Sequence, residues 1–436
     1  MNIVVVGSWY VGLTQWACLA SLGHDVVCID IDKEKIDRLK QWIIPIYEPW
    51  LDVIVKDGLL NKKLFFSTSL KDFIDTAEIV FIAVGTPTGS DGQADLQYVN
   101  AVAKELWRHL KKYTIIVNKS TVPVWTWDVV AWIIDAELQA RWMNIQFDIV
   151  SNPEFLKEWT AIKDFLEGDR IVIGCDNPNG RALQMMEKLY RWLTHTTLLK
   201  TNVYTAELIK YSANALLAVE VSFINSIAQL CEKVWADVTV VSQWLKLDSR
   251  IWKKAFLDAW PWFGGSCFPK DVIELAQVFR SYDIPNGILD ATLSINDMQK
   301  QSIVDKIKLL VPVVSWMTVS ILWLAFKPDT DDIRYASSLV IVEALLQEGA
   351  VLRVYDPQAM ENFKRIFLDV YYAWSPADCV EWSSCVVLLT HRDELLDLDR
   401  SDLGQRMLQK NLIDARNVYD MQALRDLWFT YVGVGR

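Results

Sequence analysis

Glycine is scarce in this chain, and tryptophan is abundant. The 436 residues include 17 glycines, whereas an average usage of about 7% would give roughly 30. Tryptophan contributes 21 residues. Several of these tryptophans lie at predicted turns or at close approaches of the backbone. Glycine is the residue that best tolerates the backbone conformations found there. The shortage of one residue and the excess of the other therefore need a common explanation.

Cysteine and histidine are too few and too scattered to form a metal or disulfide framework. The seven cysteines are odd in number and lack CxxC spacing, and the four histidines lack metal-ligand spacing. This pattern suits a reducing compartment and predicts neither disulfides nor a bound metal. Six cysteines lie in apolar runs where a thiol packs as a small hydrophobe: Cys18, Cys28, Cys175, Cys231, Cys379 and Cys385.

An excess of positive charge is also missing. The formal net charge of -11 argues against nucleic acid or an anionic membrane as the main partner. No uninterrupted apolar run is long enough to span a bilayer, and residues 1–7 enter an apolar strand without a basic leader. We therefore expect a cytoplasmic protein. Its 436 residues exceed one hydrophobic core and predict two or three domains.

Strand and helix patterns alternate in the first part of the chain. Residues 3–7 form a short apolar strand, residues 13–22 have helical spacing, and a second strand at Asp25–Ile29 ends in Asp30. Further strands are predicted at 79–84, 114–117, 148–150 and 170–173. Such alternation predicts a doubly wound, parallel α/β sheet.

A helical region and a second α/β region follow. One helix pattern without glycine or proline runs from Thr205 to about Lys233, and helical segments continue to about Lys308. Gly349 to Asp356 then repeats the seven-residue offset of Gly23 to Asp30, which indicates a second nucleotide-type βαβ unit. Its strands are predicted at 319–322, 351–355, 385–389 and 411–413, with a helix at 339–347. We expect a Rossmann-type domain at 1–203, a central helical domain at 204–308 and a Rossmann-like domain at 309–436.

The first turn has the form of a dinucleotide-binding loop. Residues 7–12 read Gly, Ser, Trp, Tyr, Val, Gly, a GxGxxG pattern whose middle glycine is Trp9. Asp30 lies 23 positions beyond Gly7, near the spacing at which an acid meets the adenosine ribose. Lys35 either touches adenosine hydroxyls or belongs to a solvated helix start. The alternative for the whole motif is a βαβ unit that binds nothing.

Reactive side chains follow several predicted strands. The loops 85–87 and 119–123 lie at carboxyl ends of strands, where open α/β sheets bind ligands, although ordinary turn chemistry would give the same residues. Glu154 and Glu158 would share a face if a helix begins at Pro153. Either one of them takes a proton from water, or both are solvated acids in a first helical turn.

Three more features could carry chemistry. Lys210 and Asn214 are four apart on the long helix, where the lysine could supply a fixed positive charge to an oxyanion or simply snorkel. Cys267, in the loop 264–271 between glycines and a Lys-Asp pair, has the setting of a nucleophile. The charged segment 327–334 is either a turn or a ligand clamp.

Together these segments resemble the UDP-glucose/GDP-mannose dehydrogenase family. The resemblance covers nearly the whole chain, in family order, at 7–12, 46–49, 119–123, 152–158, 207–214, 264–271 and 325–334. It implies two oxidations of the 6-hydroxyl of UDP-glucose with two NAD⁺. The intermediate would be held on Cys267 as a thiohemiacetal and then as a thioester, which water releases as the acid.

The resemblance also implies roles for individual residues. The implied catalytic residues are Cys267, Lys210, Asn214, Asp271, Thr121 and Glu158. The implied NAD contacts are Gly7, Trp9, Val11, Gly12, Asp30, Lys35, Thr86, Thr121, Glu158, Lys270 and Arg334. The implied contacts to the sugar nucleotide are Glu154, Phe155, Leu156, Lys157, Glu158, Lys210, Asn214, Phe256, Leu257, Asp258, Ala259, Trp260, Gly264 and Lys327. Arg250 resembles an arginine that reaches the substrate of a neighbouring subunit, which implies a homodimer at least.

Two rival enzymes share parts of this pattern. The GDP-mannose branch of the family has a similar cysteine loop, but residues 248–251 and the pair Phe268 and Pro269 favour the UDP-glucose branch. Hydroxyacid dehydrogenases of the 6-phosphogluconate type share the dinucleotide and helical domains. They lack both the thiol of Cys267 and a third domain such as residues 310–436.

The tryptophans are the departure from the family pattern. Trp9 would fill the place where the pyrophosphate approaches the backbone. Further family glycines are replaced at Trp50, Trp125, Trp127, Trp159, Trp252, Trp260, Trp262 and Trp323. The chain is a non-catalytic relative, or a deliberately altered sequence, or the product of a gene whose UGA codons mean glycine but are rendered as tryptophan. The retention of Lys210, Cys267 and Asp271 argues against decay, and we favour the third explanation.

Overall fold

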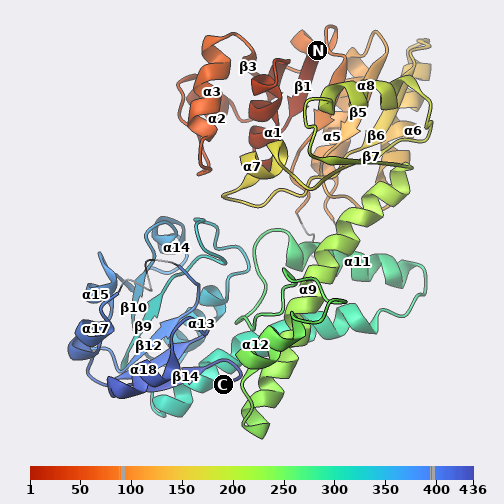
Figure 1. Ribbon diagram of the computed structural model, residues 1–436. Coiled ribbons are helices and arrows are strands. Elements are labelled where there is room, and N and C mark those ends of the chain that lie inside the picture. Colours follow the sequence, from red (N-terminus) through yellow and green to blue (C-terminus); the bar gives the residue numbers. More distant parts are fainter. Residues whose placement is uncertain (88, 90–93, 393, 395–397) are drawn as a thin grey trace. The chain divides into compact units, whose positions relative to one another are not determined.

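The chain forms two compact units. The structure, a computed structural model, describes residues 1–87, 89, 94–392, 394 and 398–436. Contacts group the chain into Met1–Ala213 and Asn214–Arg436, and the division falls inside the long helix α9 (Val203–Val234). Figure 1 shows α9 as one continuous helix, coloured light green. The two units are described one at a time.

The first unit contains an eight-stranded sheet in the order β3-β2-β1-β4-β5-β6-β7-β8. Its strands are β1 (Asn2–Val6), β2 (Asp25–Ile29), β3 (Leu64–Ser67), β4 (Ile79–Ile82), β5 (Thr114–Asn118), β6 (Phe147–Ser151), β7 (Arg170–Gly174) and β8 (Thr197–Thr201). All pairs are parallel except β6 with β7, which is antiparallel. The expectation of a wholly parallel sheet is therefore wrong at this one pair. The strand order reverses between β1 and β4, where open α/β sheets hold their ligands.

Alternation along the strands explains why helices cover both faces. In β1, Ile3 and Val5 belong to one buried cluster, and Val4 and Val6 belong to another. The helices of this unit are α1 (Tyr10–Ser21), α2 (Lys33–Lys40), α3 (Leu51–Leu60), α4 (Lys71–Ile74), α5 (Gln97–His109), α6 (Thr126–Ala140), α7 (Ala161–Leu166) and α8 (Arg181–Tyr190). Helices α1, α3 and α8 contribute to the first cluster, and α5 and α6 contribute to the second.

The second unit contains a six-stranded parallel sheet in the order β11-β10-β9-β12-β13-β14. Its strands are β9 (Thr318–Leu322), β10 (Val351–Tyr355), β11 (Tyr371–Tyr372), β12 (Cys385–Leu388), β13 (Asn411–Asp414) and β14 (Thr430–Gly433). Its helices beyond α9 are α10 (Val238–Leu245), α11 (Phe268–Ser281), α12 (Gly287–Leu310), α13 (Ser337–Gln347), α14 (Met360–Lys364), α15 (Pro376–Cys379), α17 (Arg400–Arg406) and α18 (Met421–Asp426).

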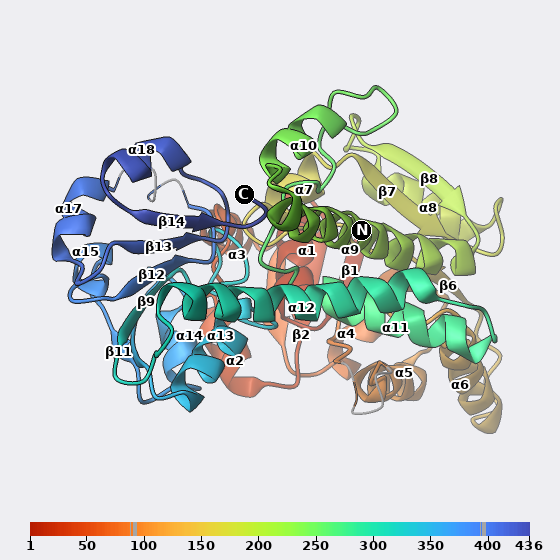
Figure 2. The same cartoon turned by 90° about the horizontal axis from the view of Figure 1, so that it is seen from below.

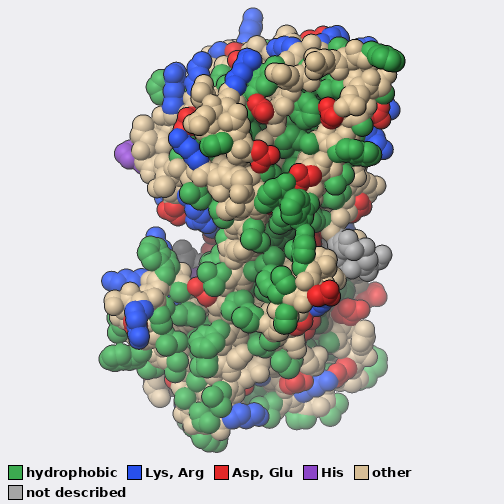
Figure 3. Space-filling model, turned by 90° about the vertical axis from the view of Figure 1, so that its right-hand side faces the viewer, with side chains coloured by type: hydrophobic (Ala, Val, Ile, Leu, Met, Phe, Trp, Pro, Cys, Tyr) green, Lys and Arg blue, Asp and Glu red, His purple; other side chains and the backbone are tan. Residues whose placement is uncertain are grey.

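Helices α9 and α12 run side by side in the second unit, as Figure 2 shows. Ser222 donates to the carbonyl of Thr292 at 2.9 Å, and Lys306 pairs with Glu232 at 2.6 Å. Ile224 and Ile303 join the same buried cluster as the strands of the second sheet. Hydrophobic side chains also reach the surface, as the green atoms in Figure 3 show.

Helix α9 has the length and composition of a bilayer-spanning segment. It runs over 32 residues, but half of its most apolar window is buried inside the protein. A buried core helix meets the same criteria. The helix predicted from Thr205 to Lys233 is confirmed.

The three-part α/β architecture is confirmed, but four strands were missed. They are the two edge strands of each sheet: β3 and β8 in the first sheet, and β11 and β14 in the second. Strand β8 is exposed along most of its length, and β11 has only two residues. Because such strands bury little apolar surface, they lack the continuous hydrophobic run that marks a central strand. The domain boundaries at 203 and 308 stay a prediction.

Candidate active site

Two glycines make a cradle at the end of β1. Gly7 has φ of +109°, a conformation that residues with a side chain rarely adopt. A Cβ on Gly12 would lie 2.1 Å from the carbonyl oxygen of Gly7, so only glycine allows α1 to begin this close to the turn. The backbone therefore leaves room for a ligand at the N-terminus of α1, where phosphates bind readily.

Asp30 closes this cradle from the end of β2. Its carboxylate accepts hydrogen bonds from the amide of Ser8 at 2.9 Å and from the amide of Asp32 at 3.0 Å. Lys35 lies 3.5 Å away. Burial alone would raise the pKa of Asp30, but a hydrogen bond from the Ser8 hydroxyl, together with the two amides and the lysine, holds the pKa below its usual value. An ionised acid at this place is suited to accept hydrogen bonds from ribose hydroxyls.

A cavity of about 300 Å³ lies beside Asp30. Of the residues predicted to contact NAD, four line it: Gly7, Trp9, Asp30 and Lys35. The Trp9 ring is half exposed and lies 5.6 Å from the Lys35 ammonium. The glycines and the carboxylate fit a dinucleotide. The Trp9 side chain does not, because it occupies part of the wall next to the cradle.

One face of α5 supplies lining residues that the sequence did not reveal. They are Tyr98, Ala101, Val102 and Glu105. Their spacing of three, four and seven residues places them on one side of a helix. That periodicity is visible in the sequence, but it does not predict which strand ends this side of the helix faces.

The other predicted cofactor residues of this unit lie outside that cavity's lining. Val11 is in the first turn of α1. Thr86 follows β4, and its hydroxyl donates to the carbonyl of Thr121 at 2.8 Å, which ties together the two loops after β4 and β5. Sequence reasoning placed both loops at strand ends, and the structure brings them into contact.

Lys210 and Glu154 form a buried ion pair. Their side chains are 5% and 7% exposed, and the ammonium lies 2.9 Å from the carboxylate. Burial would raise the pKa of Glu154, but Lys210 holds it below its usual value. Lys210 is therefore not a snorkelling surface lysine. It is a fixed charge from α9 inside the first unit.

Lys119 is a functional candidate that the sequence analysis did not single out. Its ammonium donates to Asn152 at 3.1 Å, and both residues are buried. Burial lowers the pKa of Lys119 to about 7, partly opposed by the nearby Glu154. A lysine with this pKa can exchange a proton near neutral pH. Its sequence signal was only a lysine at a strand end.

No helix begins at Pro153, contrary to the expectation. Residues 152–157 form neither helix nor strand, and the next helix, α7, begins at Ala161. Side chains take the place of helical hydrogen bonds, because the amide of Leu156 donates to Glu154 at 2.6 Å and that of Lys157 donates to Asp164 at 2.9 Å. Glu154 is consequently buried, while Glu158 is partly exposed. Phe155 lies 5.5 Å from the Lys210 ammonium.

Cys267 lies at the start of α11 in the second unit. It is the N-cap residue of that helix and is exposed, whereas the other six cysteines are buried. Gly265, with φ of +78°, turns the chain just before it and donates to the carbonyl of Arg334 at 2.9 Å. A helix N-terminus stabilises a thiolate, so this thiol is both accessible and favourably placed for reaction.

A buried polar group lies one turn into α11. Asn214 donates to Asp271 at 2.5 Å, and Lys270 lies 2.8 Å from the other carboxylate oxygen and 3.1 Å from Glu274. Burial would lower the pKa of Lys270, but Asp271 and Glu274 raise it above its usual value. Lys270 is therefore charged and committed to these two acids.

The segment before the cysteine is held by side chains from two helices. On α9, Glu220 accepts from the amide of Phe256 at 2.8 Å, and Asn225 accepts from that of Trp260 at 2.9 Å. On α12, Asn296 accepts from the amide of Phe263 at 2.7 Å. These three polar residues were missed in the sequence. For the two asparagines, the sequence offered one indication: a polar residue on an otherwise apolar helix face.

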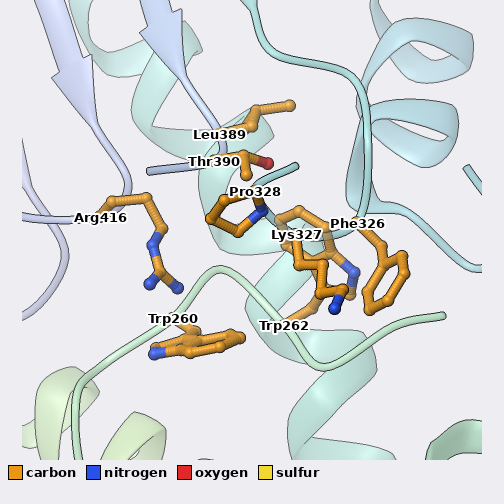
Figure 4. Close-up of a pocket in the computed structure, with 8 residues that line it drawn as sticks. All are labelled: Trp260, Trp262, Phe326, Lys327, Pro328, Leu389, Thr390 and Arg416. Atoms are coloured by element: carbon orange, nitrogen blue, oxygen red, sulfur yellow. The ribbon is translucent and has the colours of Figure 1, made fainter. Parts of the chain in front are cut away.

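A small cavity of about 10 Å³, room for about one water, lies at the carboxyl edge of the second sheet. Figure 4 shows the Trp260 indole below Arg416 and Pro328, and Trp262 near Lys327 and Phe326. The Arg416 guanidinium lies 4.0 Å from the Trp260 ring, and Lys327 lines the opposite side. Burial lowers the pKa of Arg416 to about 10. Arg416 was missed in the sequence.

Other predicted substrate residues of the second unit are placed as follows. Leu257 and Ala259 are buried, and Asp258 pairs with Lys246 at 2.7 Å. A Cβ on Gly264 would lie 2.6 Å from the carbonyl oxygen of Tyr335. The arginines are at the surface, where Arg250 pairs with Asp248 and Arg334 pairs with Asp332, each at 2.6 Å.

Comparison with known proteins accounts for both sheets and for the cysteine loop. Residues 1–194 match the NAD binding domain of the UDP-glucose/GDP-mannose dehydrogenase family, residues 204–298 match its central domain, and residues 320–421 match its UDP binding domain. The chain belongs to this family. The cradle with Asp30 lies in the NAD binding domain, and Cys267 lies in the central domain.

Relatives match over the full length of the chain. A UDP-glucose 6-dehydrogenase of Rhizobium meliloti is 41% identical over 440 residues, which cover 100% of both chains. The UDP-glucose 6-dehydrogenase TuaD of Bacillus subtilis is 41% identical over 100% of this chain and 93% of its own. The solved structure of a UDP-glucose dehydrogenase from Pyrobaculum islandicum superimposes with a TM-score of 0.92 and 32% identity, over 100% of this chain and 97% of that one.

Proposed function

We propose that this chain is an NAD-dependent UDP-glucose 6-dehydrogenase that oxidises the primary alcohol of the sugar to a carboxylate. The observation that carries the proposal is Cys267, an exposed thiol at the N-terminus of α11, one helical turn from the buried pair of Asn214 and Asp271. An enzyme that oxidises an alcohol only to the aldehyde does not need such a thiol. An oxidation that continues from aldehyde to acid does, because the thiol can hold the aldehyde carbon.

The Cys267 thiol holds the sugar carbon between the two oxidations. The 6-hydroxyl loses its proton and carbon 6 loses a hydride, which leaves an aldehyde. The Cys267 sulfur then bonds to the aldehyde carbon as the C=O π bond opens, and the thiol proton passes to the oxygen, which becomes the hydroxyl of a thiohemiacetal. Loss of a second hydride and the hydroxyl proton gives a thioester. Water adds to the thioester carbonyl, the carbon–sulfur bond breaks, and the thiolate leaves as the carboxylate forms.

Other side chains support these steps. We assign Lys210 and Asn214 to donate hydrogen bonds to the oxyanion, and Asp271, Thr121 and Glu158 to position or activate water. Buried donors stabilise a developing charge better than water does, because they are already oriented. When bound, NAD⁺ supplies the hydride acceptor. Gly7, Gly12 and Asp30 would hold it, in a cradle whose geometry excludes larger residues at position 12.

We further propose that the enzyme works in the cytoplasm as a homodimer. Leu216, Phe223 and Leu230 on α9 and Val240 and Trp244 on α10 are all at least 49% exposed. Exposed apolar side chains that recur every seven residues, as the three on α9 do, lie on one side of a helix and are typical of a surface that a second subunit covers.

The stoichiometry of NADH formation tests the activity. Purified protein should form two NADH for each UDP-glucose and release UDP-glucuronate. One NADH for each sugar, with an aldehyde as product, would contradict the role of Cys267. Turnover of GDP-mannose in place of UDP-glucose would assign the chain to the other branch of its family. No NADH from either sugar would refute the enzyme.

A further inference from the structure

Left-handed backbone is concentrated at tryptophan. Among the residues that the structure describes, 15 residues other than glycine have positive φ, and ten of these are tryptophan. They are Trp42, Trp50, Trp125, Trp142, Trp159, Trp235, Trp316, Trp323, Trp382 and Trp428. Tryptophan accounts for only 21 of the 436 residues, so the concentration does not follow from its abundance.

Tryptophan has no physical reason to prefer this conformation. With φ near +60°, the Cβ of an L-residue crowds the neighbouring carbonyl oxygen, and glycine alone avoids the conflict. Asn and Asp tolerate it better than other residues because their short polar side chains can bond to the local backbone. An indole makes no such bond that compensates the crowding.

Helix ends provide a comparison within the same chain. After α1, Gly23 donates to Ala20 at 2.9 Å and the next amide donates to Leu19 at 3.3 Å. After α6, Trp142 donates to Gln139 at 2.9 Å and the next amide donates to Leu138 at 3.0 Å. Both are the same left-handed cap, which glycine normally occupies. The caps after α2, α9 and α18 have tryptophan at this position too: Trp42, Trp235 and Trp428.

The first strands of the two sheets repeat the comparison. Gly7 follows β1, has φ of +109°, and donates to the end of β2 at 2.8 Å. Trp323 follows β9, has φ of +69°, and donates to the end of β10 at 2.8 Å. Equivalent turns therefore carry glycine in one sheet and tryptophan in the other.

The indoles are also poorly accommodated as side chains. The ring nitrogen of Trp323 is buried, and no hydrogen-bond partner lies near it among the described residues. A buried indole N–H normally finds an acceptor. Trp142 and Trp235, in contrast, are 97% and 95% exposed, so packing gives no reason to keep an indole there.

We infer that glycine, not tryptophan, occupies these ten positions in the protein that its own cell makes, and that their codons are UGA read as glycine. The fold then has its left-handed turns at the residue that tolerates them. The inference concerns the chain itself and does not rest on the proposed enzyme activity.

The gene and the native protein give the first test. The ten codons should be UGA, and peptides from the native protein should be lighter at each position by the mass difference between tryptophan and glycine. UGG codons, or native peptides with tryptophan at positions 42, 142, 235 and 428, would overturn the inference.

A pair of matched variants of the tryptophan-containing chain gives the second test. The first combines W42G, W142G, W235G and W428G, all at left-handed helix ends. The control is W132G, which lies inside α6 and is 70% exposed. The first set should raise Tm, by at least about 2 °C for each replacement, because it relieves crowding.

The control should lower Tm, because glycine weakens a helix interior. If the first set has a Tm equal to or lower than that of the unchanged chain, the structural part of the inference is overturned. The measurement is thermal unfolding without substrate. A failure of the glycine inference is therefore distinguishable from a failure of the proposed dehydrogenase activity.

Discussion

Asn214 of α9 donates a hydrogen bond from its side-chain amide to the carboxylate of Asp271 in α11 at 2.5 Å. Both side chains are buried, and Lys270 lies 2.8 Å from the second carboxylate oxygen. The carboxylate is thus fixed by an amide on one side and an ammonium on the other. Because Cys267 begins the same helix, Asp271 keeps a constant place relative to the thiol one turn away.

Asp271→Asn tests whether this carboxylate takes part in the chemistry. The change removes the charge and keeps the shape, so kcat should fall by about 100-fold or more, the usual effect of losing an acid–base group. The measurement is NADH formation at saturating UDP-glucose. Glu274→Gln is the matched control, since Glu274 pairs with the same Lys270 but lies a further turn from Cys267. Equal losses in the two variants would reduce Asp271 to a structural role.

Selective alkylation tests the exposure of Cys267. Iodoacetamide should modify one cysteine in the native protein, because the other six are buried, and activity should disappear at the same rate. Peptide mass spectrometry identifies the residue. Cys267→Ser should remove the label and stop turnover. A label on a buried cysteine that tracks the loss of activity would contradict the assignment.

Lys210→Ala should destabilise the first unit strongly. Removal of the lysine leaves the buried carboxylate of Glu154 without its ion pair, a change that typically costs about 3–5 kcal/mol. Urea unfolding measures it. Lys157→Ala is the control, since Lys157 pairs with Asp164 at 2.8 Å but is 65% exposed, and its loss should cost below about 1 kcal/mol. Similar costs for the two variants would show that burial of the first pair is unimportant.

Glu207 should make stability depend on pH. Burial raises its pKa from 4.5 to about 8, with Asp128 and Asp176 adding to the rise. The native state then holds a proton that the unfolded chain releases, so the contribution of Glu207 is full below pH 4.5 and is lost as pH rises to 8. Glu207→Gln should therefore be more stable than the parent at pH 8 and similar at pH 4.5. Parallel stability curves of the two proteins against pH would disprove this.

Trp9→Gly should improve cofactor binding. The Trp9 ring lines the cavity beside Asp30, and its removal leaves room where a dinucleotide meets the backbone. The Kd for NAD⁺ should fall at least about tenfold, equivalent to about 1.4 kcal/mol. Calorimetric titration measures it. Trp42→Gly, which lies outside the cavity, should leave Kd unchanged, and a matching improvement there would point to a global effect of stability.

The elements with strong local patterns could be predicted from the sequence. Strand β2 runs over Asp25–Ile29 and β10 over Val351–Tyr355, as expected, and α9 differs from its prediction by one or two residues at each end. Cys267 also stood apart in the sequence, because it lies between a pair of glycines and a Lys-Asp pair. These features depend on residues close together in the chain, which periodicity and turn chemistry report directly.

The chemistry of the two strand-end acids could not be predicted. Asp30 and Asp356 have the same offset from a preceding glycine, but Asp30 lines a cavity, whereas Asp356 is fully buried. Asp356 accepts hydrogen bonds from four backbone amides, including those of Leu324 and Ala325 at 2.9 and 3.1 Å. It stabilises the turn after β9 and has little capacity left for a ligand.

The sequence by itself determined the βαβ openings, the long helix and the reactive thiol, because each is encoded within one or two turns of chain. Only the tertiary structure decided which acid faces a cavity, which lysines are buried, and which tryptophans stand on left-handed backbone. Those properties depend on partners such as Lys210 and Glu154, 56 positions apart, or on φ angles that no side-chain pattern records. Residues that are far apart along the chain become partners only in the folded structure, so the sequence pattern does not predict these properties.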